Sequence, residues 1–558
     1  MDRRRFLRMA AGTSAALLTA DAATRRAAQA RQIPQPAAAK PNILVIVVDQ
    51  MRYPQWFPDQ ATLDTYLPNL ARLRQNAVDF THHYAAATAC TPSRACMLTG
   101  LYGHQHFCLI TQTSHLHPDF PTWGDYLRSF GYDTHWFGKW HLSEDCGDDD
   151  PPYTYLEPYG FNTYTCPDPH GAPGQGLNTD DDIANQFADW LANPSARAET
   201  PWCATVSFVN PHDIMFYPRF TDHIAGEDSA PSVFSDLPPN FETAQELQTR
   251  GKPTLQQELI KAANRQFGAM SYTGANAEAA WIKMLDTYLL LHQYVDQQIG
   301  VVLDALDAQP AVKGNTVVIF TCDHGDYCGS HGLRGKGGAV YEESTRVPFT
   351  LQDHSGLLGV QPGQRTQLTS HVDLAPLLMT IAYGGSGWRA LPECQQLASR
   401  LDMLAIATNP GAAGRSYVLH TTDEPGTEEK VDVDYQPFAG ETANHVIAYR
   451  TAAGKLATYS HWVENSIEIT TDGQEVECYD YGTDAGRKEI DNIHDSSHPL
   501  YSQLMDELVS DAIPTELRAP LPSALQQAQQ EALTQYLTDI GQLGYRLHLP
   551  IIQDGSDS

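Results

Sequence analysis

Two uninterrupted runs of apolar residues constrain the fold of this chain more than any other feature. Asn42 to Val48 reads NILVIVV and is followed by Asp49, and Asn315 to Thr321 reads NTVVIFT. A strand without polar alternation is buried on both faces, as in a parallel sheet covered by helices. Between the runs, TWGDYLRSFGY predicts a helix ending near Gly131, while THWFGKW and ATVSFVN predict strands. The sequence therefore predicts an α/β fold.

Polar and charged residues follow the predicted strands at the points where the strands end. In parallel sheets, ligand-binding groups gather outside the carboxyl ends of the strands, because those ends meet at one edge. In this sequence that edge would carry Asp49, Lys139, His141, His212 and Asp323. The pattern predicts one polar site built from several strand ends.

Length and charge limit the architecture and the partners. A chain of 558 residues exceeds the size of a single hydrophobic core, so a large domain and a smaller one are expected. The sequence has 36 Lys and Arg against 67 Asp and Glu, a net charge of -31. Such acidity argues against nucleic acid or an anionic membrane surface as a partner.

We expect a large domain over residues 40–425 and a small α+β domain over residues 435–558. Arg415 to His420 predicts a last strand of the large domain, and an acidic loop follows it. Beyond the loop, HVIAYRT, GKLATYSHW and QEVECYDYG predict a small antiparallel sheet, with helices near the C-terminus. Within the large domain, Phe220 to Ala275 predicts a long excursion over the site, and Ala279 to Asp307 predicts a packing helix.

The N-terminal residues 1–30 resemble a twin-arginine export signal. Arg3 and Arg4 are followed by Phe6, Leu7 and an alanine-rich stretch that is too short and interrupted to span a membrane. The resemblance implies a bacterial protein exported to the periplasm or secreted, with the twin-arginine translocase as a partner and no membrane span. A disordered basic tail is the alternative. The ten cysteines of so long a chain do not form a disulfide framework, and their pairing stays open.

Two strand ends carry candidate metal ligands. Asp49 and Gln50 follow the first apolar run, and Asp323 and His324 follow the second. Three oxygen donors and one imidazole suit a divalent cation, for which calcium is favoured and magnesium or manganese are alternatives. Either aspartate alone would be interpreted as a helix N-cap.

The segment CTPSRACMLTG, Cys90 to Gly100, sets a cysteine, a proline and Arg94 at fixed spacing. The alternative is a half-buried thiol beside a helix start. In FGKWHLS, Lys139 and His141 lie two residues apart, so on a strand both would face the same way and could share one anion. His212 and Lys336 add two basic groups. His331, on the same glycine-rich loop as Lys336, we interpret as a structural hydrogen-bonding residue.

Together these motifs resemble the sulfatase family of the alkaline phosphatase superfamily. The resemblance follows, in order, NILVIVVDQ, LPNLARLRQNAVDFTHHYAAATACTPSRA, GYDTHWFGKWHL, NPHD, CDHGDYCGSHGLRGKGG, YEESTRVPF and SHVDLAPLL. It implies a large α/β domain, with a mixed and mostly parallel sheet between helices, and a small C-terminal domain with an antiparallel sheet. It also implies hydrolysis of a small-molecule sulfate ester.

The resemblance assigns roles to these residues. In the family, the cysteine of C-x-P-S-R is oxidised to Cα-formylglycine, so Cys90 would carry the aldehyde after a formylglycine-generating enzyme has read Cys90, Pro92 and Arg94. Arg94 would hold the nucleophile in place. The metal site would comprise Asp49, Gln50, Cys90, Asp323 and His324, and the sulfate would be surrounded by Lys139, His141, His212 and Lys336.

The implied reaction begins when one hydroxyl of the hydrated aldehyde attacks sulfur, while His212 or Lys336 protonates the departing alcohol. His141 then takes the proton of the second hydroxyl, so that the aldehyde re-forms and sulfate leaves.

This chain departs from many family members, which have Asp-Asp and Asp-Asn at the positions of Asp49-Gln50 and Asp323-His324. The Gln and His pattern resembles choline-sulfatase-like enzymes and phosphonate monoester hydrolases of the same superfamily. A phosphonate monoester or phosphodiester hydrolase is therefore the first alternative, although such enzymes usually lack the pair formed here by Lys139 and His141. A non-catalytic binding protein that keeps Cys90 as a thiol is the second. For the alcohol half, aryl, choline-like, steroid and sugar sulfates all stay open.

Overall fold

A large mixed sheet organises the computed structural model, which describes residues 40–55, 60–111, 114–147, 151–194, 200–224, 226–274, 276–424, 442–463 and 466–543. Over these ranges the sheet has eight strands, with the order β10-β2-β9-β7-β1-β6-β4-β5. Their bounds are β10 (Gly363–Arg365), β2 (Val78–Phe80), β9 (Phe349–Asp353), β7 (Thr316–Cys322), β1 (Asn42–Asp49), β6 (Trp202–Pro211), β4 (Asp133–Gly138) and β5 (Asn162–Thr163). Only β9 runs antiparallel to its neighbours within the described sheet, so the expectation of a mixed and mostly parallel sheet is confirmed.

Strand β1 lies at the centre and is buried along its whole length, as its apolar run predicts. It pairs in parallel with β6 on one side and with β7 on the other. Because side chains alternate along a strand, Ile43, Val45 and Val47 pack on one face while Leu44 and Ile46 pack on the other. The absence of polar alternation in this run therefore reflects two apolar layers.

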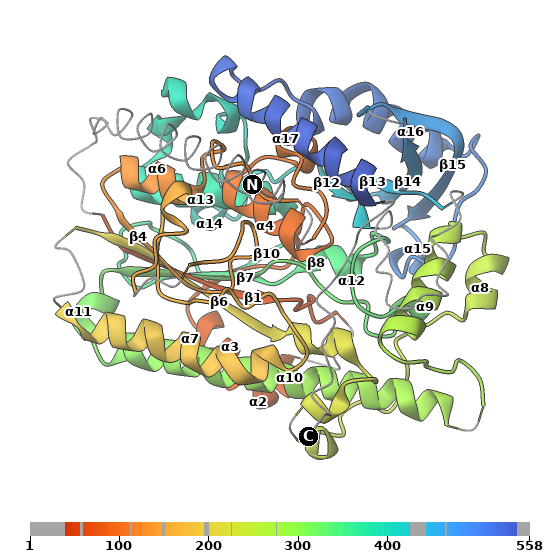
Figure 1. Ribbon diagram of the computed structural model, residues 1–558, viewed down its shortest axis with the longest axis horizontal. Coiled ribbons are helices and arrows are strands. Elements are labelled where there is room, and N and C mark those ends of the chain that lie inside the picture. Colours follow the sequence, from red (N-terminus) through yellow and green to blue (C-terminus); the bar gives the residue numbers. More distant parts are fainter. Residues whose placement is uncertain are drawn as a thin grey trace, which may run out of the picture.

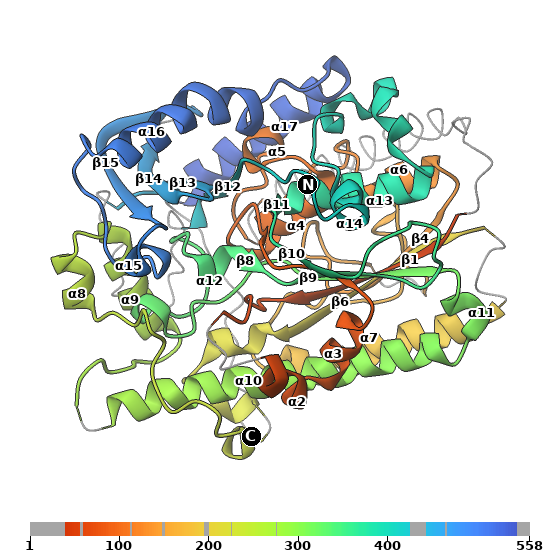
Figure 2. The same cartoon turned by 180° about the vertical axis from the view of Figure 1, so that it is seen from behind.

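Helices cover both faces of the sheet (Figures 1 and 2). On one face lie α7 (Gln175–Ala192), α10 (Ala277–Asp307), α2 (Gln60–Tyr66) and α3 (Pro68–Arg74). On the other face lie α4 (Cys90–Thr99), α6 (Trp123–Ser129), α13 (Leu374–Tyr383) and α14 (Met403–Thr408). The long helix α10 agrees with the packing helix expected from Ala279 to Asp307, since it contacts both α7 and β6.

A second, antiparallel sheet is built from the C-terminal part of the chain. In the described part of the chain it has four strands, β12 (Tyr417–Thr422), β13 (His445–Thr451), β14 (Gly454–Trp462) and β15 (Ile469–Asp480). Helix α16 (Pro499–Glu507) packs on it, and α17 (Ser523–Leu543) returns to the core of the large sheet. In the described residues, β11 (Thr369–Ser370), β3 (His83–Tyr84) and β8 (Arg346–Val347) pair as a separate short sheet.

One expectation about the strands is wrong. Arg415 to His420 was expected to be a last strand of the large domain, but β12 pairs antiparallel with β13 across six residue pairs. It also contacts the segment after β3, through an isolated bridge between Thr421 and Ala87 and a hydrogen bond between His420 and the carbonyl oxygen of Ala85. The sequence pattern of a buried strand does not say which sheet the strand joins.

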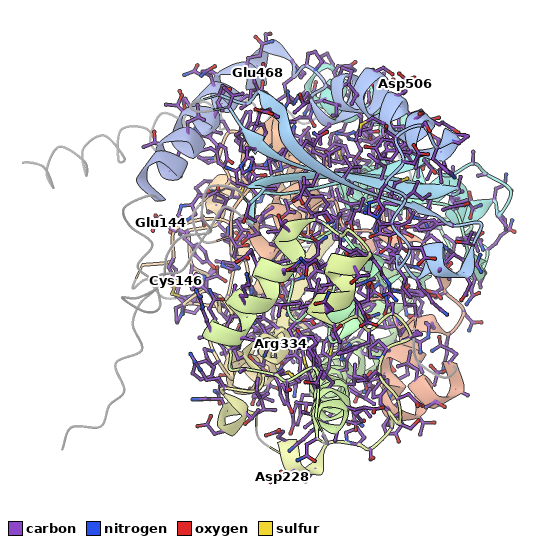
Figure 3. All side chains as sticks on the ribbon, turned by 90° about the vertical axis from the view of Figure 1, so that its right-hand side faces the viewer. Glu144, Cys146, Asp228, Arg334, Glu468 and Asp506 are labelled. Carbon is purple, nitrogen blue, oxygen red and sulfur yellow. A yellow bond between two sulfur atoms is a disulfide. The ribbon has the colours of Figure 1, made fainter. Side chains whose placement is uncertain are left out.

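The segment expected as an excursion contains α8 (Ala244–Thr249) and α9 (Thr254–Gln266), together with short turns of helix. Figure 3 shows this region face on, with Arg334 near its middle. The guanidinium of Arg334 donates to the carbonyl oxygens of Tyr217 and Gly268 and to Asn264, so it links the loop that carries Lys336 to the excursion.

The remaining short helices are α5 (Gly103–His106), α11 (Pro310–Lys313), α12 (Glu342–Thr345) and α15 (Asp484–Arg487). The export signal expected over residues 1–30 lies outside the described residues. None of the helices in the described ranges is both long and apolar enough to cross a membrane. One disulfide joins Cys146 to Cys166, and Figure 3 places Cys146 at the edge of the molecule.

Candidate active site

The predicted strand ends meet at one edge of the large sheet, where α4 also begins. Asp49 is the last residue of β1, and Asp323 follows β7 directly. Lys139 follows β4, and His212 follows β6. Cys90 is the first residue of α4 and is wholly buried. Residues far apart in the sequence thus form one polar cluster, as expected from the parallel sheet.

The thiol of Cys90 lies among cations and metal-ligand types. Its Sγ atom is 2.7 Å from Nζ of Lys336, 3.2 Å from Nε2 of His324 and 3.6 Å from Oδ1 of Asp49. Burial, reinforced by the charge of Asp49, raises the pKa of the thiol to about 11. An unmodified Cys90 would therefore hold its proton at neutral pH and be a poor nucleophile.

Arg94, one turn further along α4, joins the two strand-end carboxylates. Its Nε atom lies 2.8 Å from Oδ2 of Asp323, and its Nη2 atom lies 3.4 Å from Oδ2 of Asp49. The third nitrogen donates to the carbonyl oxygen of Lys139 and to Oγ of Ser207. All three ionised side chains are fully buried, so this guanidinium fixes the relative positions of α4, β1 and β7.

The donor set fits a divalent cation. Ligand atoms of Asp49, Cys90, Asp323 and His324 all lie within 4.8 Å of one another. Nδ1 of His324 is 2.9 Å from the carbonyl oxygen of Gly325, so this nitrogen donates and Nε2 keeps its lone pair for a ligand. The amide oxygen of Gln50 is buried and finds no hydrogen-bond partner among the described residues. A cation would supply the interaction that this oxygen lacks.

Asp49 is surrounded by positive charge. Nζ of Lys139 lies 2.8 Å from its Oδ2 atom, and Nζ of Lys336 lies 3.8 Å from its Oδ1 atom. Burial alone would raise the pKa of Asp49, but Lys139, Lys336 and the neighbouring histidines hold it well below its usual range. The carboxylate is therefore ionised and available to a metal ion or a cationic side chain.

The expectation that Lys139 and His141 share a strand is wrong. Strand β4 ends at Gly138, whose φ of 87° turns the chain, and His141 itself has a φ of 61°. The backbone amides of Trp140 and His141 instead donate to the carboxylate of Asp168, at 2.8 and 2.7 Å. Both residues still reach the buried cluster, but through a turn held by Asp168.

Two imidazoles of the site, His141 and His212, have buried ring nitrogens without a hydrogen-bond partner among the described residues. Both ring nitrogens of His141, and Nδ1 of His212, are buried and unpartnered among the residues with assigned positions. Burial lowers the pKa of each imidazole well below its usual range, and the charge of Lys139 beside His141 and of Lys336 beside His212 lowers it further. Gly171 covers His212, since a Cβ atom there would lie 2.6 Å from the ring.

Comparison with known proteins identifies the family. The sequence profile described as Sulfatase matches residues 41–385, which is more than half of the 558 residues. The chain belongs to the sulfatase family. The resemblance stated from the motifs is thereby confirmed.

Curated relatives of this sulfatase-family chain are distant. The uncharacterized sulfatase YidJ of Escherichia coli is 28% identical over 341 residues, which cover 56% of this chain and 62% of the relative. The matched region is thus less than two thirds of that relative's length. A choline-sulfatase of Rhizobium meliloti is 25% identical over 379 residues, covering 62% of this chain and 68% of the relative.

Solved structures share the fold. A phosphonate monoester hydrolase from Silicibacter pomeroyi aligns with a TM-score of 0.62 at 20% identity, over 87% of this chain and 97% of that one. A putative sulfatase from Bacteroides thetaiotaomicron aligns with a TM-score of 0.61 at 21% identity, over 85% and 92%. At these identities the likeness concerns the α/β architecture and not the substrate.

Three residues that support the sulfatase site were not singled out from the sequence. Asp168 holds the turn after β4, Tyr288 donates its hydroxyl to the carbonyl oxygen of Gln50 at 2.5 Å, and Asp326 accepts from the amide of Gln50. Asp326 carries a sequence signal, since it is a third polar residue in the strand-end segment that begins at Asp323. Tyr288 carries none, because it sits within the helical pattern of α10.

His331 has the structural role expected of it. Its Nδ1 atom lies 2.7 Å from Glu242, and its Nε2 atom lies 3.1 Å from the amide nitrogen of Asn240 and 3.7 Å from Glu343. Burial disfavours the charged imidazole, but these carboxylates raise its pKa. Lys336 lies on the same glycine-rich loop as His331. His331 thus attaches this loop to the excursion over the site.

Proposed function

We propose that this protein hydrolyses a small-molecule sulfate monoester to an alcohol and inorganic sulfate. The observation that carries the proposal is the position of Cys90, at the start of α4, where a buried metal-donor set and the ammonium groups of Lys139 and Lys336 converge. Sulfate esters are anions, and their hydrolysis needs fixed positive charge, an in-line nucleophile and a proton donor for the leaving oxygen.

The nucleophile in this proposal is a hydroxyl of the hydrated Cα-formylglycine made from Cys90. A divalent cation, for which the oxygen donors favour calcium, would polarise the sulfate and the nucleophile when bound. Asp49, Gln50, Asp323 and His324 would hold it, with manganese or magnesium as alternatives.

The surrounding side chains divide the remaining tasks. Lys139 and Lys336 present ammonium groups to the sulfate oxygens, and Arg94 holds the carboxylates that position the nucleophile. His141, whose lowered pKa keeps it neutral, can accept the proton when sulfate is expelled. His212 and Lys336 are the two groups proposed to protonate the departing alcohol. Burial lowers the pKa of His212. Around Lys336 the effect of burial is exceeded by that of Cys90 and Asp49, which raises its pKa, so Lys336 is the group that holds its proton at neutral pH.

We also propose the compartment and partners that this chemistry requires. Residues 1–30 would direct the folded protein through the twin-arginine translocase to the periplasm or outside the cell. A formylglycine-generating enzyme would act on Cys90 before export. The catalytic domain would comprise residues 40–425 and the C-terminal domain residues 435–558, with β12 contributed by the first to the sheet of the second.

The mass of the peptide that contains Cys90 tests the proposal. Protein produced in its own host, or together with a formylglycine-generating enzyme, should show the aldehyde mass and release sulfate from an aryl sulfate. Protein from a host without that enzyme is the control and should carry the thiol and lack turnover. An unmodified thiol in active protein would overturn the proposed nucleophile.

A phosphonate monoester or phosphodiester hydrolase is the second candidate, and Gln50 and His324 favour it because this pair resembles that branch of the superfamily. Aryl esters of sulfate, phosphonate and phosphate diester with one common leaving group separate the candidates. The proposal predicts the highest kcat/KM for the sulfate. If the leaving group is released faster from the phosphorus esters, the substrate class is a phosphonate or phosphate diester and not a sulfate monoester.

Lys139 gives a prediction for the anion site. Replacing it by Met removes the ammonium group 2.8 Å from Asp49 while keeping an unbranched side chain in the buried space. We expect kcat for an aryl sulfate to fall by about 10² to 10³, as loss of one oxyanion donor does in other enzymes. Lys261→Met, at an exposed pair on α9 with Glu258, is the matched control and should leave kcat unchanged. A change of less than about threefold at Lys139 would contradict its place in the sulfate site.

A further inference from the structure

The side-chain amide of Gln50 is held by a carboxylate on the loop after β7. Oδ2 of Asp326 lies 2.5 Å from Nε2 of Gln50, and Oδ1 of Asp326 lies 2.6 Å from the backbone nitrogen of Cys328. Both Gln50 and Asp326 are fully buried. Asp326 therefore uses its two oxygens to accept from two separate donors.

The backbone of Gln50 is fixed independently of its side chain. Its φ of 69° lies in the left-handed region, its nitrogen donates to Oδ1 of Asp323 at 3.1 Å, and its carbonyl oxygen accepts from Tyr288. With the backbone held, the side-chain amide can still take two orientations, with either its NH₂ group or its oxygen facing Asp326. An ionised carboxylate only accepts hydrogen bonds, so it selects the NH₂ group and leaves Oε1 on the other side.

That selection matters because Oε1 of Gln50 is a buried oxygen without a hydrogen-bond partner among the described residues. An amide oxygen is a good ligand for a hard divalent cation, whereas an amide NH₂ repels one. We propose that Asp326 is a positioning residue that orients the Gln50 amide with its oxygen toward the cation. This inference rests on the cation site of the proposed function.

The substitution Asp326→Asn tests the orientation with almost no change in shape. An asparagine has one accepting oxygen and one donating NH₂, while its two neighbours here are both donors. The backbone nitrogen of Cys328 cannot turn, so the oxygen of the new side chain stays with it and the NH₂ faces Gln50. The Gln50 amide is then expected to flip, which points its own NH₂ at the cation.

Cation affinity is the readout, because it requires neither substrate nor formylglycine. Chelator-treated protein is titrated with Ca²⁺, and separately with Mn²⁺, by calorimetry. We expect Asp326→Asn to weaken binding about 10- to 100-fold, the usual effect of losing a residue that orients a metal ligand. The unfolding temperature of the metal-free variant reports whether the fold is retained.

A second substitution, at Gln50, should restore the cation affinity that Asp326→Asn removes. When Gln50→Glu is combined with Asp326→Asn, one oxygen of the introduced glutamate accepts from the asparagine NH₂ and the other faces the cation. The double variant should bind the cation at least about tenfold more tightly than Asp326→Asn alone. A protein weakened only by damage to its fold would not be rescued in this way.

The results of these titrations distinguish failure of the positioning role of Asp326 from failure of the proposed metal site. Wild-type protein that binds neither cation would overturn the proposed metal site itself. Wild-type binding with unchanged affinity in Asp326→Asn would overturn only the positioning role of Asp326. Weakened binding without rescue by Gln50→Glu would also overturn it, because the loss would not then arise from the orientation of the amide.

Discussion

Replacing Cys90 by Ala is expected to abolish hydrolysis of a sulfate ester while the protein stays folded. The substitution removes the precursor of the proposed nucleophile and only one buried sulfur atom. Loss of a nucleophile costs on the order of 10⁶ in kcat in the best studied case, so turnover should fall by at least about 10³. Initial rates with an aryl sulfate at saturating substrate check this.

Cys96 supplies the control for that experiment. It lies on the same helix, is equally buried, and its Sγ atom is 3.5 Å from His106 rather than near the site. Cys96→Ala should therefore retain the kcat of the wild type, with a small loss of stability of about 1 kcal/mol from the lost sulfur. Equal turnover by Cys90→Ala and Cys96→Ala would overturn Cys90 as the source of the nucleophile. Absence of turnover in the formylglycine-bearing wild type as well would favour the non-catalytic binding protein over the enzyme.

Much of the fold was predictable because its strongest signals are local. The apolar runs around β1 and β7 report burial on both faces, and burial on both faces of a strand implies helices on either side. Asp49 and Asp323 each lie at the end of a parallel strand, so both can be placed at the same edge of the sheet without knowing the other elements of the fold. The described structure confirms these elements and brings the predicted polar residues into one cluster.

What was missed depends on contacts between distant segments. The turn at Gly138 moves Lys139 and His141 off the strand, and the carboxylate that holds the turn, Asp168, is 27 residues from the nearer amide. Tyr288 looks like any apolar-face residue of a helix, yet its hydroxyl meets the backbone of Gln50. The residues of β12 show a buried pattern that fits either sheet. Only the pairing with β13 shows that the strand belongs to the antiparallel sheet.

Removal of the Arg94 guanidinium is expected to destabilise the protein strongly as well as inactivate it. Arg94→Met leaves the carboxylate of Asp323, 2.8 Å from Nε in the native protein, without its charged partner in a fully buried site. Asp49 keeps Lys139 at 2.8 Å, so most of the cost falls on Asp323. Breaking a buried pair on one side costs about 3 to 5 kcal/mol in unfolding free energy.

Urea unfolding in the presence of a chelator measures this loss without help from a bound cation. Arg72 on α3 is the matched control, because its ion pairs with Asp304 and Asp307 are partly exposed and Arg72→Met should cost no more than about 1 kcal/mol. Arg94→Lys keeps the charge but cannot span both carboxylates with a planar fork, so its stability should fall between the other two variants. If Arg94→Met loses no more stability than Arg72→Met, the ion pair of Arg94 with Asp323 does not contribute to folding as argued here.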